Sequence, residues 1–225
     1  VLFDGKTGAP RAMIDGEALT NRRTAAASAL ASTYLSRPDS AVLALVGTGH
    51  LSPALAHAHV AIRPIRRVLV WGRSAAKAEA LAARLREEGL PAEPAADLPA
   101  AVSAADIVSC ATTSTQPLVL GRHVHPGTHV DLVGAFTPAM RESDDALIRV
   151  ARVYVDTYAG ALREAGDLTQ PIADGTWSED QLAGDLHDLC SGAKAGRRDA
   201  EEITVFKSVG ASLEDLVAAS LVVEG

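Results

Sequence analysis

Residues 41–62 read AVLALVGTGHLSPALAHAHVAI, and this stretch decides the fold class. It opens with an unbroken run of six apolar residues, which is typical of a strand buried on both faces of a parallel sheet. A Gly-Thr-Gly turn follows at 47–49, and apolar residues at helical spacing continue from 52 to 62. A second apolar strand at 68–71 and an alanine-rich helix at 74–88 repeat this order. The stretch therefore predicts an α/β fold of the Rossmann type, with a doubly wound parallel sheet.

The rest of the chain carries similar patterns. Before residue 41 we expect a hairpin around the glycine-containing turn at 4–8 and a helix over 17–35, which ends before Pro38. Strands and helices then continue to alternate, as expected for parallel strands joined by crossover helices. The further predicted strands are 106–110, 130–133, 152–156 and 203–206, and the further predicted helices are 97–104, 143–150, 178–189 and 212–222.

Composition and charge narrow the class of partner. The chain has 21 basic and 28 acidic residues, and its net charge of -7 argues against nucleic acid as a partner. Apolar runs are too short for a membrane span, and the histidines lack the spacing of a zinc site, so we expect no membrane partner and no metal. Two cysteines are consistent with the reducing cytoplasm. The sequence begins with Val1 inside an expected strand, so we interpret it as a piece of a longer protein.

The turn after the first buried strand resembles a dinucleotide-binding loop. It follows the G-x-G-x-x-G pattern except that Ser52 stands at the third glycine position. Small residues there allow a close approach to a pyrophosphate, and the helix N-terminus supplies donors and partial positive charge. An ordinary strand-to-helix turn is the alternative, and His50 is either a phosphate donor or a solvent-facing loop residue. The predicted pyrophosphate loop comprises Gly47, Thr48, Gly49, His50 and Leu51.

The end of the second strand bears on cofactor choice. NAD sites usually have a carboxylate here that accepts hydrogen bonds from the ribose 2′-hydroxyl, but this sequence reads Trp71-Gly72-Arg73-Ser74. Arg73, Ser74 and Lys77 are suited to surround a 2′-phosphate. The alternative is that the two basic residues are simply solvated at a helix start. The pattern favours NADP(H), with NAD(H) as the second choice.

A series of longer strings extends the comparison over nearly the whole chain. They resemble, in the same order, the characteristic blocks of the ornithine cyclodeaminase/mu-crystallin family. The strings are GEALTNRRTAA at 16–26, GTG at 47–49, ADIV at 105–108, ATT at 111–113, PGTHV at 126–130, EAGDL at 164–168, GAKAGR at 192–197 and EITVFKSVG at 202–210.

The resemblance implies two lobes and a homodimer. Residues 38–208 would form the dinucleotide-binding Rossmann domain, while 1–37 and 209–225 would belong to a substrate-binding and dimerisation lobe. The implied chemistry is hydride transfer at a carbon bonded to nitrogen, between NADP(H) or NAD(H) and a small amino or imino acid.

Site residues follow from the family blocks. Arg23 matches the arginine beside the cofactor and the substrate carboxylate, a task suited to a forked guanidinium, and Thr24 supports it. Thr112 and Ser208 match positions that contact the cofactor. Gly72 stands where the family often has a ribose-binding Asp, which agrees with the preference for NADP(H).

One block departs from the family pattern. Family enzymes tend to read G-A-D-x-P-G-K-x-E-L where this chain reads GAFTPAMRES at 134–143. The family Asp transfers protons in ornithine cyclodeaminase, but Phe136 stands in its place and a phenyl ring exchanges no proton. No catalytic residue is therefore assigned, and the departure favours imine reduction. The alternatives are true ornithine cyclodeamination, from ornithine to proline and ammonia, and a non-catalytic NADPH-binding protein like mu-crystallin.

Overall fold

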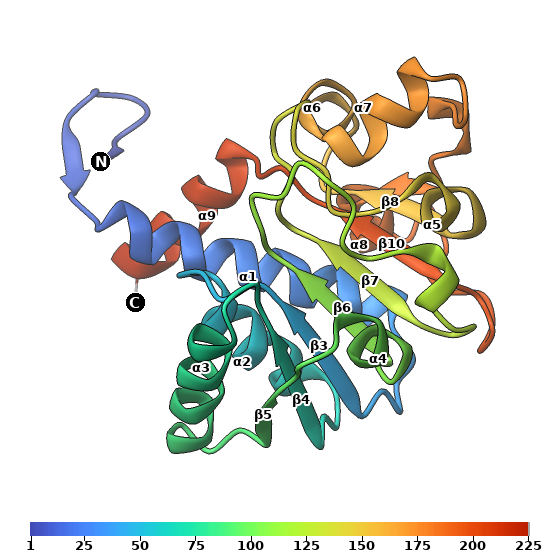
Figure 1. Cartoon of the computed structure of the whole chain (residues 1–225). Helices are drawn as coiled ribbons and strands as arrows, with labels where there is room; N and C mark the ends of the chain where they lie inside the picture. Colours follow the sequence, from blue (N-terminus) through green and yellow to red (C-terminus); the bar gives the residue numbers. More distant parts are fainter. Residues whose placement is uncertain (225) are drawn as a thin grey trace.

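The computed structural model describes residues 1–224 and centres on an eight-stranded, all-parallel sheet (Figure 1). The strand order reverses between β3 and β6, which is the crevice where doubly wound sheets bind ligands. The Rossmann-type prediction is confirmed. In spatial order the strands are β5 (Ala92–Pro94), β4 (Arg67–Trp71), β3 (Val42–Val46), β6 (Ile107–Cys110), β7 (His129–Leu132), β10 (Thr204–Lys207), β8 (Arg152–Val155) and β9 (Gly184–Asp185).

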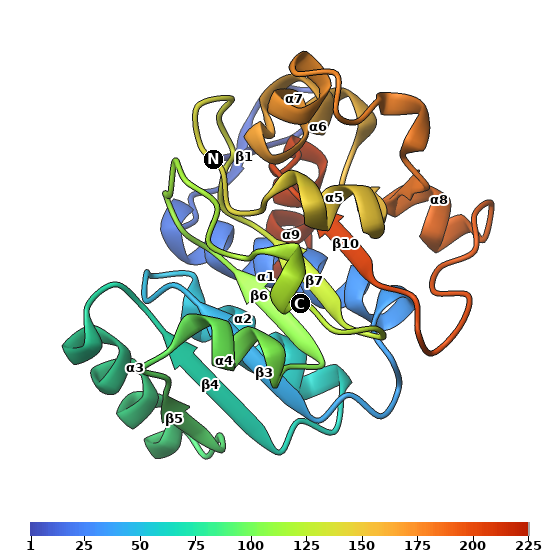
Figure 2. The ribbon, with the colours of Figure 1, turned by 45° about the vertical axis from the view of Figure 1, so that its right-hand side comes forward.

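Helices cover both faces of the sheet, which explains why the strands are apolar throughout. Leu43 and Leu45 of β3 pack with the face that carries α2 and α3, whereas Ala44 and Val46 pack with the opposite face. In Figure 2, α4 lies in front of the strands and α1 passes behind them. The helices are α1 (Gly16–Leu35), α2 (Ser52–Ile62), α3 (Ala75–Glu87), α4 (Leu98–Ser103), α5 (Asp145–Val150), α6 (Tyr158–Glu164), α7 (Gly166–Ala173), α8 (Leu186–Ser191) and α9 (Ser212–Glu224).

The two ends of the chain come together at α1. The predicted amino-terminal hairpin is present as β1 (Leu2–Phe3) and β2 (Pro10–Ala12), paired antiparallel. Helix α9 lies beside the first half of α1 (Figure 1). The second half of α1 packs on the sheet through Ala31 and Leu35, which join a cluster with residues of β8 and β10. Helix α1 therefore links the sheet to both chain ends.

The helix predicted over 178–189 is wrong. Ser178 caps only a 3-10 turn at Glu179–Gln181. The chain then extends as β9, because Gly184 and Asp185 pair with β8 at the edge of the sheet. Asp185 accepts a hydrogen bond from the Asp188 N–H at 2.8 Å and so begins α8. Asp185 is itself a favourable N-cap residue, so the sequence contained a signal for a helix that begins after residue 185 rather than after Ser178.

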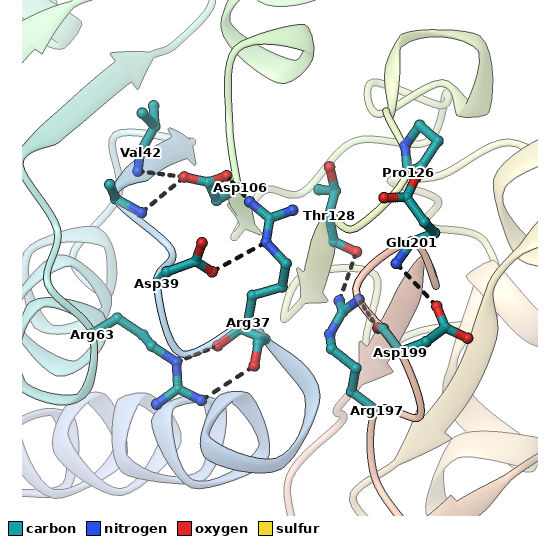
Figure 3. A network of polar contacts seen from close by, with 12 residues as sticks. Arg37, Asp39, Val42, Arg63, Asp106, Pro126, Thr128, Arg197, Asp199 and Glu201 are labelled. Carbon is teal, nitrogen blue, oxygen red and sulfur yellow. Dashed lines mark hydrogen bonds and ion pairs between the residues drawn. The ribbon is translucent and has the colours of Figure 1, made fainter.

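Polar side chains close the amino end of the sheet. The Asp106 carboxylate, just before β6, accepts hydrogen bonds from the Ala41 and Val42 N–H groups at 2.8 and 2.9 Å and from the Arg37 guanidinium at 2.5 Å (Figure 3). Arg197 donates to the Leu35 carbonyl oxygen at 2.7 Å. These contacts fix the end of α1 to the sheet. The carboxyl ends of the strands, on the opposite side, remain available for a functional site.

Candidate functional site

A cavity of about 660 Å³ opens at the carboxyl ends of β3, β4, β6, β7 and β10, where the sheet meets α1. Every site residue predicted from the sequence lines it, although these residues come from six separate segments. They are Arg23, Thr24, Gly47, Thr48, Gly49, His50, Leu51, Gly72, Arg73, Ser74, Lys77, Thr112, Phe136 and Ser208. Their binding roles stay predictions, but their gathering makes this cavity the candidate site.

The first glycine of the loop is required by its backbone. Gly47 has φ +120°, and a Cβ there would overlap the Ala111 carbonyl oxygen of the neighbouring strand end. Ser52 is buried and donates from Oγ to the Gly47 carbonyl oxygen at 3.0 Å. Ser52 therefore closes the loop with a hydrogen bond, which explains a hydroxyl residue at the third position of the motif.

Unpaired donors follow this glycine. The backbone N–H groups of Thr48, Gly49 and His50 donate to no acceptor within residues 1–224. Helix α2 begins after Leu51, which provides no side-chain cap, whereas Asp97 caps α4 by accepting from the Ala100 N–H at 3.1 Å. Exposed N–H groups at a helix start favour an anion. The loop thus fits the pyrophosphate of a dinucleotide.

The end of β4 offers positive charge without a carboxylate. Arg73 and Lys77 are exposed and form no ion pair with another side chain of residues 1–224. Ser74 begins α3 by accepting from the Lys77 N–H at 3.4 Å. A Cβ at Gly72 would lie only 2.7 Å from Thr48 Cγ2, so a side chain at this position would require Thr48 to move.

Two predicted residues have partners that the sequence did not suggest. The Arg23 guanidinium lies in the cavity wall and binds Glu214 at 2.9 Å and Asp215 at 2.8 Å, both from α9. Burial raises the pKa of Glu214, and the Arg23 charge opposes that rise. His50 is mostly exposed, and its Nδ1 contacts the carboxylate of Glu17 on α1. In this structure His50 therefore points to α1 rather than along the glycine loop.

A buried acidic pair lies under the cavity, and it was not predicted from the sequence. Glu142 and Asp167 are both fully buried, and Lys207 of β10 is buried beside them, with Nζ 3.7 Å from Asp167 Oδ2. Asp167 Oδ1 accepts from the N–H groups of Glu142 and Ser143 at 2.9 and 2.7 Å. All three charged residues lie in the family-like strings or in the block at 134–143 that departs from the family pattern. A lysine inside a central strand could have pointed to buried acidic partners.

Glu142 connects this pair to the cavity. Its Oε1 accepts from the Thr112 N–H at 2.6 Å, the Thr112 hydroxyl at 2.8 Å and the Cys110 thiol at 3.2 Å. Burial raises the pKa of Glu142 to about 7; the Lys207 charge opposes this rise and the Asp167 charge adds to it. The carboxyl group is therefore poised to exchange a proton near neutral pH.

A second buried network fixes α1 and α2 against the sheet. Asp131 of β7 accepts from Ser109 Oγ at 2.7 Å and from Ser28 Oγ of α1 at 3.0 Å, and its other contact is His59 Nε2 of α2 at 3.3 Å. Burial opposes ionisation of Asp131, but the His59 contacts hold its pKa below the ordinary value. Because Ser28 lies just beyond Arg23 and Thr24 on α1, this network positions that part of the cavity wall.

The side chains and helices of the described residues also bear on the expected metal and membrane partners. Among residues 1–224, no group of three or more His, Cys, Asp or Glu side chains is arranged to hold a metal ion. None of the helices in the same part of the chain combines the length and apolarity needed to cross a bilayer.

The chain has extensive similarity to known proteins. A Delta(1)-pyrroline-2-carboxylate reductase of Paracoccus denitrificans is 44% identical over 225 residues, which is 99% of this chain and 71% of that protein. The structure of the Thermococcus litoralis Delta(1)-pyrroline-2-carboxylate reductase with NADH and L-proline matches with a TM-score of 0.96 and 34% identity, over 99% of this chain and 69% of that one. An archaeal alanine dehydrogenase dimer with bound NAD matches with a TM-score of 0.93 and 27% identity, over 99% and 68%.

The whole sequence also matches a family model. The model of the ornithine cyclodeaminase/mu-crystallin family matches residues 1–225, the whole of the sequence. The same strings that suggested the family form the glycine loop, the β6 end and the β10 end of one cavity. This chain belongs to the ornithine cyclodeaminase/mu-crystallin family.

Proposed function

We propose that this protein is a nicotinamide-dependent reductase that converts the C=N bond of a small cyclic imino acid into an amine. One observation carries the proposal: Phe136 lies in the wall of the cavity, at the position of the family acid, and the residue is 48% exposed. An exposed phenyl ring gives the cavity an apolar wall suited to a hydrocarbon ring, and it cannot exchange the proton that the family acid exchanges in cyclodeamination. The similarity to Delta(1)-pyrroline-2-carboxylate reductases supports the same reaction.

The glycine loop and the neighbouring strand ends would hold the cofactor. The unpaired N–H groups at 48–50 would bind the pyrophosphate, and Thr112 and Ser208 would flank the nicotinamide side of the cavity. A reduced nicotinamide bound there supplies the hydride that an imine carbon accepts. The chain's part is to orient the substrate and to exclude water.

Arg23 would bind the substrate carboxylate. Its present partners, Glu214 and Asp215, are carboxylates themselves, so the guanidinium already has the geometry that this task requires. Substrate binding would then displace at least one of them, a movement of α9 relative to α1. Several apolar residues of α9 are exposed, which supports the division into a 38–208 nucleotide domain and a second lobe formed from 1–37 and 209–225, and with it a homodimer.

NADP(H) is our proposed cofactor, because Arg73 and Lys77 have no ion-pair partner among residues 1–224 and Gly72 carries no carboxylate. A parallel fluorescence titration with NADPH and NADH, reported by Trp71 in the cavity wall, tests this choice. We expect Arg73→Ala to weaken NADPH binding about tenfold and leave NADH binding nearly unchanged. Arg84→Ala, on the helix α3 that follows Arg73 but outside the cavity, is the matched control. Equal binding of both cofactors by the unaltered protein would contradict the 2′-phosphate assignment.

The reaction itself is tested by turnover. NADPH oxidation with Delta(1)-pyrroline-2-carboxylate is expected to be rapid, while ammonia release from ornithine is expected to be undetectable. Ornithine turnover without imine reduction would return cyclodeamination to first place. Cofactor binding without any turnover would instead support a binding protein.

A further inference from the structure

The floor of the cavity is thin at one point. Gly134 lines the cavity, and a Cβ there would overlap both the Thr112 carbonyl oxygen and Glu142 Oε1. Glu142 therefore lies directly beneath the floor, separated from the cavity only by the Gly134 backbone and by Thr112. Phe136, two residues further on, lines the same wall. The position that lost the family acid and the point where Glu142 approaches the cavity therefore belong to the same wall.

The hydrogen bonding of Glu142 is unequal between its oxygens. Oε1 receives all three donors, whereas Oε2 is buried without a hydrogen-bond partner among residues 1–224. Asp167 Oδ2 is likewise buried without a hydrogen bond. A buried carboxylate with an unpaired oxygen is costly, but protonation removes that charge. The local arrangement therefore favours a proton held on Glu142.

We propose that Glu142 and Thr112 form a proton relay, in which the Thr112 hydroxyl donates a proton to the imine nitrogen and Glu142 replaces it. Thr112 is the link, because this residue lines the cavity and its Oγ1 donates to Glu142 Oε1 at 2.8 Å. Glu142 acts through Thr112 and is a positioning residue that also stores the proton. This inference rests on the proposed reductase function and supplies the acid that Phe136 lacks.

The protons and electrons balance across the relay. As hydride adds to the imine carbon, the C=N π electrons take the proton of the Thr112 hydroxyl and form the amine N–H bond. In this structure the Thr112 hydroxyl donates to Glu142 Oε1. In the proton-loaded state of the relay this hydrogen bond is reversed: Oε1–H donates to Thr112 Oγ1, and the Thr112 hydrogen turns toward the imine nitrogen. The Oε1 proton then moves to Thr112 Oγ1 as Thr112 gives up its own, so the threonine ends neutral and Glu142 ends as a carboxylate that again accepts from Thr112. Lys207 Nζ stabilises that carboxylate, and solvent protons reload it through Thr112 after the amine leaves.

The charged and titratable groups that face Glu142 come from three elements. Lys207 on β10 and the hydrogen bond donated by the Cys110 thiol on β6 favour its ionised form, while the charge of Asp167 on α7 favours its neutral form. Burial raises the pKa of Cys110 well above its ordinary value, so the thiol stays neutral. Asp167 and Lys207 are 3.7 Å apart and offset each other's charge. The proton on Glu142 is therefore governed mainly by burial.

The test compares four variants of the same protein. Thr112→Val keeps the shape and removes the hydroxyl, and we expect kcat for imine reduction to fall about a hundredfold. Thr112→Ser restores the hydroxyl and is expected to recover most of the rate. Glu142→Gln keeps a hydrogen-bond acceptor but stores no acidic proton, so we expect a low kcat that no longer declines as the pH rises through about 7. Thr115→Val, exposed on the same loop and outside the cavity, is the control.

A second readout does not depend on turnover. Infrared spectra of the cofactor-free protein are expected to show a protonated carboxyl band that disappears as the pH rises through about 7 and that is absent in Glu142→Gln. The relay is overturned if this band is missing from the unaltered protein, or if Thr112→Val or Glu142→Gln retains the wild-type rate and pH profile. If the unaltered protein binds NADPH but reduces no imine, the proposed function fails, and the infrared titration still decides whether Glu142 stores the proton.

Discussion

The two ends of the parallel sheet use the same chemical groups in opposite ways. At the amino end, Arg37 and Asp106 bind each other, and the N–H groups of Ala41 and Val42 also donate to Asp106 (Figure 3). At the carboxyl end, the N–H groups at 48–50 and the Arg73 guanidinium have no partner from residues 1–224. Charge alone therefore does not mark a binding site. Donors that the protein leaves unpaired do, because only a ligand or water can complete them.

Removing the Asp106 carboxylate at the amino end of the sheet should give the greatest loss of stability. Asp106→Ala leaves the Arg37 guanidinium and two N–H groups without their acceptor, so we expect the free energy of unfolding to fall by about 4 kcal/mol. Denaturant titration measures this loss, and cofactor affinity per folded molecule should be unchanged. Asp39→Ala is the matched control, because Asp39 pairs with the same Arg37 but is 81% exposed. We expect it to cost less than about 0.5 kcal/mol. Equal losses for the two variants would contradict the assignment of stability to this end.

The pKa values of the carboxyl groups of Asp106 and Glu142 are shifted in opposite directions, which affects how stability depends on pH. Burial opposes ionisation of Asp106, but the Ala41 and Val42 N–H groups and Arg37 hold its pKa below the ordinary value, whereas burial raises the pKa of Glu142 to about 7. The folded protein therefore binds the Glu142 proton more tightly than the unfolded chain does between pH 4.5 and about 7. Its contribution to the free energy of unfolding falls by about 3 kcal/mol as the pH rises across this interval.

Glu142→Gln isolates that contribution. The unfolding free energy of the variant, relative to the unaltered protein, should rise across the same interval, as measured by denaturant titration at several pH values. The subtraction removes the opposite trend expected from His129, whose pKa burial lowers to about 3. A difference that stays constant with pH would mean that Glu142 is ionised throughout.

Alanine substitutions at two glycines, Gly49 and Gly127, should affect cofactor binding and stability separately. A Cβ at Gly49 would meet no protein atom within 4 Å, so Gly49→Ala should leave the unfolding free energy almost unchanged. Gly49 lines the cavity in the predicted pyrophosphate loop, so we expect the added methyl group to weaken NADPH binding about tenfold in the Trp71 fluorescence titration. Gly127→Ala at the amino end should show the reverse, because Gly127 has φ +86° and a Cβ there would overlap the Arg37 side chain. Loss of stability in Gly49→Ala would show that the loop is structural.

Local patterns predicted most of the fold. The apolar run at 42–46, the turn at 47–49 and the helix at 52–62 lie where the sequence indicated, because each depends on neighbours within a few residues. The short edge strand β9 was missed because its two residues are extended only through pairing with β8. The helix predicted there was wrong for the same reason.

The α/β order and the glycine loop followed from the sequence alone, since strand and helix periodicity places that loop at the carboxyl end of a parallel sheet. Arg23, Thr24, Thr112 and Ser208, which also line the cavity, were expected from the resemblance to the family. Only the tertiary structure decided that Arg23 binds Glu214 and Asp215, which are 191 and 192 residues away. It also decided that Glu142 is buried beneath Thr112. Partners distant in the chain and the burial that shifts a pKa depend on which surfaces pack together, and no local pattern records that choice.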